Sequence, residues 1–387
     1  MKNMKKRIFC LVMAGVMLSL SISVSAANTS AADPFDHYDD FTIENFAAMD
    51  DMTAEQNMIR YFQDQVDNSS YGGIYYDENG VLVVNIVREH YDEFSAVPTT
   101  FSDGTSVEYR VVEYSLQELE TVKDTLAGYM NQYRIAMLDA NEMTNQVDVA
   151  LFNYDSNVRN EILSIAESIH PNIPINFIDY SDCTIQSTVA FEKPEYPADS
   201  NILDLDSASI QSDITVFSGQ PIQMNGGYYT LGPITSSQTA FSAGHGVSMT
   251  GTSVYTGFLK LIGIAHGYYG GRYGDWSRIS LGSNVDTAVQ HRMTYPVMGQ
   301  SVRMLGAVSG ITNGSVSNTN IDVYADAPWA NLTGMCSATY SCQRGDSGAA
   351  ILLSNNSCVG IQSGATFDVN GNWNGMSYFT PADKFYL

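Results

Sequence analysis

Acidic residues are distributed very unevenly along the chain, and this unevenness divides it into two parts. Residues 27–206 contain 34 of the 42 Asp and Glu residues and 7 Lys and Arg, whereas residues 207–387 contain 8 Asp, no Glu and 7 Lys and Arg. A chain of 387 residues exceeds the usual length of one compact domain. The sequence therefore predicts two units that meet near residue 206. The acidity of the first favours solubility, and nothing supports a basic face for nucleic acid.

The acidic part has the local patterns of an α+β fold. Apolar strands flank Asn79-Gly80, a dipeptide typical of hairpin turns. Ser115 and Glu118 form a capping-box pattern ahead of apolar residues at helical spacing. A strand and then a helix are expected over 147–169. Prolines and polar residues over 192–206 predict a linker.

The second part has a different build. Residues 207–387 are rich in Gly, Ser, Thr and Tyr and contain short apolar alternations. This pattern predicts antiparallel strands that close into barrels. The expected organisation is therefore an α+β unit followed by an all-β unit.

The first 26 residues have the three regions of a secretion signal. Basic residues precede the apolar run from Ile8 to Leu20, and Val24-Ser25-Ala26 precedes a cleavage site after Ala26. The apolar run is short for a membrane span. We therefore expect a secreted, extracellular protein without a stable membrane anchor.

Ser347 stands in the loop sequence Gly345-Asp346-Ser347-Gly348, directly before the apolar run 349–353. Glycines allow a sharp turn and bring backbone N–H groups close to a substrate carbonyl. The apolar run predicts a buried strand that anchors the loop. An ordinary turn has the same composition. The motif therefore indicates a nucleophile only if the rest of the chain supplies a base and a carboxylate.

His245 lies between two glycines, directly after a Thr/Ala/Phe strand. A nucleophilic serine needs such an imidazole as its base, and the base needs a carboxylate that fixes its tautomer. Asp286 begins a short apolar strand and is the expected partner of His245. Asp275 is the alternative, but Arg272 or Arg278 nearby favours a loop ion pair for it.

Taken in order, these blocks resemble the chymotrypsin-fold serine peptidases, and most closely the bacterial streptogrisin and alpha-lytic protease group. The blocks that carry the resemblance are residues 240–245, 284–289, 296–310, 344–348, 359–364 and 377–381. Gly72-Gly-Ile-Tyr-Tyr76 also resembles the pro-regions of alpha-lytic-type proteases.

The resemblance implies a double antiparallel β-barrel, chymotrypsin-like, over residues 207–387, preceded by an α+β pro-region over residues 27–206. It implies a catalytic triad of His245, Asp286 and Ser347, with the N–H groups of Gly345 and Ser347 as the oxyanion hole. Ser363 and Gly364 are expected on the strand that pairs with the substrate backbone. The activity implied is cleavage of protein or peptide substrates, without a cofactor or a metal.

The pro-region is expected to assist folding and to block the active site until it is removed by cleavage near residues 200–213. A β-rich unit with non-local strand pairing folds slowly, which gives a folding aid a physical purpose. The alternative is an independent binding domain that the mature protein retains.

Three positions depart from the family pattern. Gly246 stands where bacterial members often have Cys directly after the histidine. Arg303-Met304 stands where they tend to have Cys-Arg, and that arginine commonly pairs with the acid beside the nucleophile. Either Arg303 or Arg344 is therefore a candidate partner of Asp346.

The expected specificity pocket contains no acid over 337–343 or 363–366, which predicts an apolar or aromatic residue at P1, the substrate position before the cleaved bond. Gln362 stands where glutamate-specific relatives tend to carry His.

Among Cys336, Cys342 and Cys358, we expect one disulfide that involves Cys342, with its partner open. The alternative to an enzyme is a catalytically inactive protease-fold binding module.

Overall fold

The computed structural model describes residues 59, 62, 66–94, 106–187, 214–247, 251–257, 259–324 and 331–385. We call residues 59–187 of this set the N-terminal half and residues 214–385 the C-terminal half. The predicted signal peptide, the linker over 192–206 and the expected processing region near 200–213 lie outside the described residues. Among the described residues, no helix is both long and apolar enough to cross a membrane.

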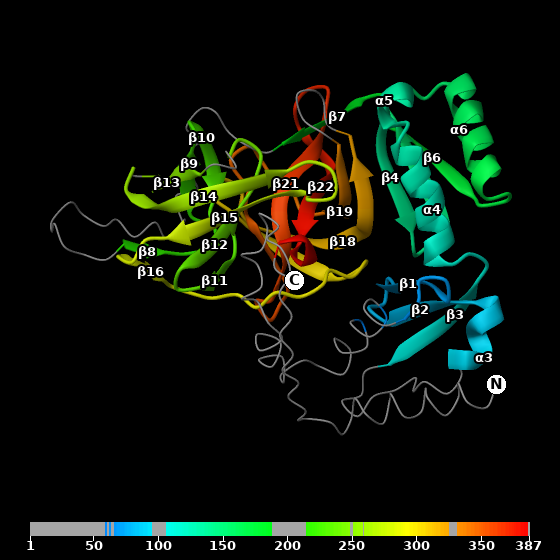
Figure 1. The fold of residues 1–387 in the computed structure, drawn as a ribbon, viewed down its shortest axis with the longest axis horizontal. Helices are drawn as coiled ribbons and strands as arrows, with labels where there is room; N and C mark the ends of the chain where they lie inside the picture. The colour runs from blue at the N-terminus through cyan, green and yellow to red at the C-terminus, as the bar shows by residue number, and fades with distance from the viewer. Residues whose placement is uncertain are drawn as a thin grey trace, which may run out of the picture.

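The N-terminal half has an α+β fold, as expected (Figure 1). Its helices are η3 (Arg88–His90), α3 (Tyr91–Phe94), α4 (Leu116–Ala127), α5 (Met130–Tyr133) and α6 (Ser156–Ile169). Its strands are β1 (Tyr71–Tyr76), β2 (Leu82–Val87), β3 (Val107–Val112), β4 (Ile135–Asn141), β5 (Gln146–Leu151), β6 (Ile175–Asp179) and β7 (Cys183–Ser187).

The local predictions for this half are confirmed. Strands β1 and β2 form an antiparallel hairpin around Asn79-Gly80, where Gly80 has a φ of 76°. Helix α4 begins with the capping box, because Ser115 Oγ accepts from Glu118 N while Glu118 Oε2 accepts from Ser115 N. Strand β5 and helix α6 follow each other over 146–169.

The C-terminal half is built from β-strands, which confirms the expected all-β class. One sheet has seven strands in the order β10-β9-β13-β14-β15-β12-β11, and a parallel ribbon of β8 and β16 accompanies it. These strands are β8 (Ile214–Val216), β9 (Pro221–Met224), β10 (Gly227–Thr230), β11 (Ile234–Ser236), β12 (Thr239–Ser242), β13 (Thr252–Thr256), β14 (Leu261–Tyr269), β15 (Asp275–Leu281) and β16 (Val285–Thr287). Its core is mostly aliphatic and includes Ile222, Val254 and Ile279 together with Tyr229.

The second sheet of this half extends into the N-terminal half. Its ten strands comprise the path β17-β20-β21-β22-β19-β18-β4-β5-β6, with β7 paired to β21. The strands of the C-terminal half are β17 (Ser301–Gly306), β18 (Gly310–Val323), β19 (Leu332–Ala338), β20 (Ala350–Leu352), β21 (Cys358–Asp368) and β22 (Trp373–Pro381), and η4 (Ala382–Lys384) follows. Figure 1 shows β4–β6 and their helices beside β18 and β19. The two halves therefore share a hydrogen-bonded sheet.

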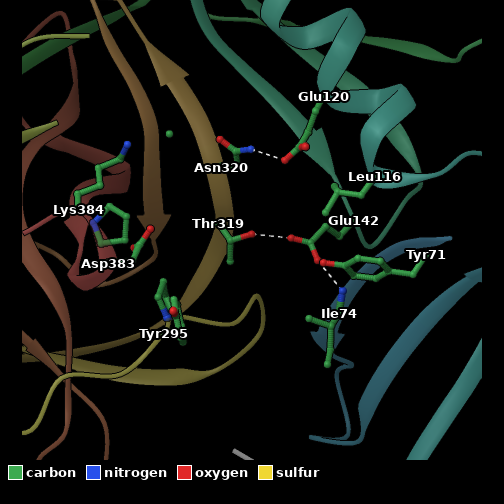
Figure 2. Close-up of a pocket in the computed structure, with 13 residues that line it drawn as sticks. Tyr71, Ile74, Leu116, Glu120, Glu142, Tyr295, Thr319, Asn320, Asp383 and Lys384 are labelled. Carbon is green, nitrogen blue, oxygen red and sulfur yellow. Dashed lines mark hydrogen bonds between the residues drawn. The ribbon is translucent and has the colours of Figure 1, made fainter. Parts of the chain in front are cut away.

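The contact between β4 and β18 is antiparallel, with Ile321 opposite Asp139 and Val323 opposite Met137. Next to it lies a cavity of about 270 Å³ lined by both halves (Figure 2). Glu142 bridges its two sides, since it accepts from Thr319 Oγ1 at 2.6 Å and from Ile74 N at 2.6 Å. We call this contact between the halves, formed around Glu142, the polar seam. The amino-acid composition, which separates the halves near residue 206, gave no sign of it.

Candidate active site

His245 and its carboxylate partner lie where the seven-stranded sheet meets the second sheet. His245 follows strand β12, and Asp275 begins strand β15, which pairs with β12. His245 Nδ1 and Asp275 Oδ2 are 2.6 Å apart. Both side chains are buried, with His245 3% exposed and Asp275 0% exposed. This is the base and carboxylate pair that a serine nucleophile needs.

The partner of His245 is thus Asp275, and the prediction of Asp286 is wrong. Asp286 lies on β16, opposite Thr215 of β8, and its side chain is exposed. The preceding Val285 points into the core, and side chains alternate along a strand, so Asp286 has to face outward. The apolar neighbours that favoured Asp286 are what direct it away from the site.

The register between β12 and β15 explains why Asp275 reaches His245. In the β12–β15 ladder Ser242 lies opposite Ser277, so two further steps along both strands bring Gly244 opposite Asp275. Hydrogen bonds bear this out, because Gly244 N donates to Asp275 Oδ1 at 2.8 Å and His245 N does so at 2.7 Å. The strand pairing, rather than the local sequence, identifies the carboxylate.

Ser347 joins this pair through Ser363. Ser347 Oγ donates to the carbonyl oxygen of Ser363 at 3.3 Å. The hydroxyl of Ser363 in turn donates to Asp275 Oδ2. The expected triad positions His245 and Ser347 therefore lie in one buried cluster with Ser363, although they are 102 residues apart in the sequence.

The imidazole is oriented with its other nitrogen available. In a neutral imidazole with this geometry, Nδ1 donates to the carboxylate and Nε2 has the lone pair. His245 Nε2 is buried and has no hydrogen-bond partner within the part of the chain that the structure describes. Its ring is flanked by Tyr229 and Tyr269, at centroid distances of 5.7 Å and 6.3 Å. An imidazole held in this way can accept a proton.

The loop that carries Ser347 is held by Asp346. Its carboxylate accepts from Val308 N, Ser309 N, Ser309 Oγ and Gln343 N at 2.5–3.1 Å. Burial raises the pKa of this carboxyl, against the effect of those donors. Gly348, which ends the loop, has a φ of 94°, and a Cβ there would lie 2.1 Å from Ser242 Oγ. Glycine is therefore required at that turn.

Neither candidate arginine contacts Asp346. Arg303 donates to Asn356 Oδ1, and Arg344 donates to Gln186 Oε1 at 2.7 Å. Val308 and Ser309, in the turn between β17 and β18, donate to Asp346 where an arginine was expected.

The predicted disulfide with Cys342 is absent, because Cys183, Cys336, Cys342 and Cys358 are all free thiols. Each buried thiol has its own polar neighbour: Cys336 Sγ donates to Thr319 O, Cys342 Sγ contacts Ser377 Oγ and Cys358 Sγ donates to Gly360 O. Burial raises the pKa of all three, so they remain protonated and unreactive.

Comparison with known proteins gives matches among solved structures. No family model matches the chain, and no curated protein sequence matches it. Protease A of Thermobifida fusca is 25% identical and has a TM-score of 0.36, with 43% of this chain and 91% of that chain covered. The chymotrypsin of Cellulomonas bogoriensis is 21% identical, with a TM-score of 0.37 and coverage of 44% and 93%.

A Nocardiopsis protease is 19% identical and has a TM-score of 0.36, with 44% of this chain and 93% of that chain covered. These three solved structures are bacterial proteases.

Proposed function

We propose that this chain is a secreted serine endopeptidase made as a precursor, which cleaves peptide bonds through an acyl-enzyme. The observation that supports it best is the buried His245–Asp275 pair at 2.6 Å, joined to Ser347 through Ser363. A purely structural cluster would not need an imidazole whose Nε2 is buried without a partner in the described residues.

In the proposed reaction, Ser347 Oγ attacks the scissile carbonyl carbon while His245 Nε2 accepts the hydroxyl proton. The imidazolium then donates this proton to the leaving amine as the C–N bond breaks. Water repeats the sequence on the acyl-enzyme and releases the acid. Asp275 accepts from Nδ1 throughout and stabilises the imidazolium.

The N–H groups of Gly345 and Ser347 are the proposed oxyanion hole, because they belong to the tight loop that presents the nucleophile. Ser363 and Gly364 are proposed to bind the substrate backbone. Strand pairing at Gly364 supports this role, since an extended segment, β7, already pairs there with Ser187 opposite Gly364.

The same pairing supports inhibition by the N-terminal half. Strand β7 runs antiparallel along β21 from Gly364 to Asp368, directly beyond Ser363. Arg344, three residues before the nucleophile, also contacts Gln186 of β7. A substrate that pairs with β21 at the same positions has to displace β7. We therefore propose that residues 27–206 act as a pro-region that blocks the site until cleavage and assists folding.

The segments expected to form the specificity pocket, 337–343 and 363–366, contain no acidic residue, which supports an apolar or aromatic preference at P1. Gln362 is fully buried, accepts from Tyr340 Oη at 2.6 Å and donates to Gly364 O at 2.9 Å and Cys342 Sγ at 3.3 Å. Its polar groups are thereby used within the protein. Gln362 therefore has no polar group left to bind the carboxylate of a Glu side chain.

A fluorophosphonate probe tests the proposal, because it reacts with an activated serine. The protein secreted from the full-length chain is expected to be labelled at Ser347, with no labelling of Ser347→Ala and unchanged labelling of Ser354→Ala, an exposed serine. Peptide-library cleavage then gives the P1 preference, and N-terminal sequencing gives the processing sites. An unlabelled but folded protein that binds peptides would favour the inactive binding module instead.

A further inference from the structure

Strand β10 lies between the loop that carries His245 and the loop that carries Ser347. Two consecutive residues of β10 contact both loops: Tyr229 Oη donates to the carbonyl oxygen of His245 at 3.0 Å, and Thr230 N donates to the carbonyl oxygen of Ser347 at 2.8 Å. The first loop follows β12 of the seven-stranded sheet, and the second precedes β20 of the ten-stranded sheet. One dipeptide therefore connects the base and the nucleophile across the junction of the sheets.

The side chain of Thr230 strengthens this connection. Its hydroxyl donates to the carbonyl oxygen of Gly345 at 2.9 Å and accepts from Ala307 N at 3.0 Å. Its own carbonyl accepts from Ser242 Oγ at 2.9 Å, and Ser242 ends the strand that leads to His245. Thr230 is completely buried. All of its polar groups thus contact the segments that position the site.

Tyr229 occupies space that only glycine at position 246 leaves open. Gly246 has a φ of 90°, and a Cβ at that position would lie 2.3 Å from Tyr229 Oη and 3.5 Å from Tyr229 Cζ. Asn225 Nδ2 donates to the carbonyl oxygen of Gly246 at 3.1 Å, so the β9–β10 hairpin holds the loop at two points. Burial raises the pKa of the Tyr229 phenol, which keeps it a donor.

We propose that Tyr229 and Thr230 are positioning residues that set the alignment of His245 and Ser347, an inference that rests on the proposed peptidase activity. They act through backbone carbonyls and do not touch the substrate. Proton transfer from Ser347 to His245 depends on their separation, and an error of about 1 Å in such geometry can cost about 100-fold in rate. With no disulfide among the described cysteines, hydrogen bonds perform this alignment.

The test measures kcat and KM per labelled active site in protein produced from the full-length chain. Tyr229→Phe and Thr230→Val are each expected to lower kcat about tenfold with KM unchanged, since each loses hydrogen bonds to buried groups and affects only the transition state. Thr230→Ser keeps the hydroxyl and is expected to restore kcat. Tyr228→Phe, one residue away and partly exposed, is the control that leaves kcat unchanged.

A second arm examines the contact with position 246. Gly246→Ala introduces the same backbone strain in either background, but its clash with Oη is absent in Tyr229→Phe. Its effect on kcat is therefore expected to be smaller in the Tyr229→Phe background than in the parent. Equal effects in both backgrounds would contradict the assigned contact.

Two outcomes separate this inference from the proposed function. A parent protein labelled at Ser347, with variants that lose thermal stability but keep its kcat, would overturn the positioning role and leave the peptidase intact. A folded parent protein that neither reacts with the probe nor cleaves peptides would reject both proposals.

Discussion

Two buried carboxylates, Asp275 at the candidate active site and Glu142 at the seam between the halves, are held in different ways. Asp275 contacts four donors, all from the C-terminal half: Gly244 N, His245 N, His245 Nδ1 and Ser363 Oγ. Glu142 contacts two, one from each half. The first carboxylate is oriented for a partner, whereas the second connects two units. Burial alone therefore does not indicate the role of a carboxylate. The role follows from which parts of the chain supply its hydrogen-bond donors.

Replacement of Asp275 is expected to have the largest effect. Asp275→Asn keeps the shape but stabilises the wrong imidazole tautomer, so we expect kcat to fall by about 10⁴-fold. Asp286→Asn is the matched control and should leave kcat unchanged, because Asp286 is exposed on β16. Peptide hydrolysis by the two variants measures this. Loss of activity in Asp286→Asn instead would reverse the assignment.

Glu142 predicts a pH dependence for the seam. Burial raises its pKa to about 7 from an ordinary value of 4.5, and the charge of Glu120 adds to the shift. A carboxyl with a raised folded-state pKa contributes full stability below pH 4.5 and loses that contribution as the pH rises to about 7. Burial likewise raises the pKa of Asp139 on the adjoining strand. The association of the halves should therefore weaken between these pH values.

Glu142→Gln tests this dependence, because it removes the titrating group and keeps its size. At pH 8 the variant is expected to unfold with a free energy about 1–3 kcal/mol higher than the parent, and near pH 4.5 the difference should vanish. Urea denaturation of the full chain across this range provides the measurement. Glu78→Gln, in the exposed β1–β2 turn, is the control. Parallel pH profiles for the parent and Glu142→Gln would contradict the prediction.

Ser309 offers the smallest and most local test. Ser309→Ala removes one of the four donors to Asp346 and leaves three backbone N–H groups in place. We expect a loss of about 1 kcal/mol in stability, the usual contribution of one such hydrogen bond. Denaturation of this variant beside Ser354→Ala measures it. A much larger loss, with fewer sites reactive toward the probe, would show that the hydroxyl itself holds the loop.

The accuracy of the sequence predictions follows the range of the interactions involved. The hairpin at Asn79-Gly80 and the capping box at Ser115 were correct, because neighbouring residues determine them. Asp286 was wrong, because the choice of carboxylate depends on the register between β12 and β15. The disulfide was wrong for a similar reason, since cysteine pairing depends on which side chains the folded core brings together.

Local sequence patterns were enough to predict the α+β build of the N-terminal half, the β-rich build of the C-terminal half, and the glycine-flanked positions of His245 and Ser347. These follow from composition, periodicity and glycine placement, all of which act within a few residues. Long-range contacts in the fold were needed to learn that Asp275 faces His245, that β10 contacts the loops of His245 and Ser347, and that β7 and β4 extend the sheet of the C-terminal half. Strand register and sheet pairing join residues far apart in the chain, and a local pattern does not specify which of several possible partners will be met.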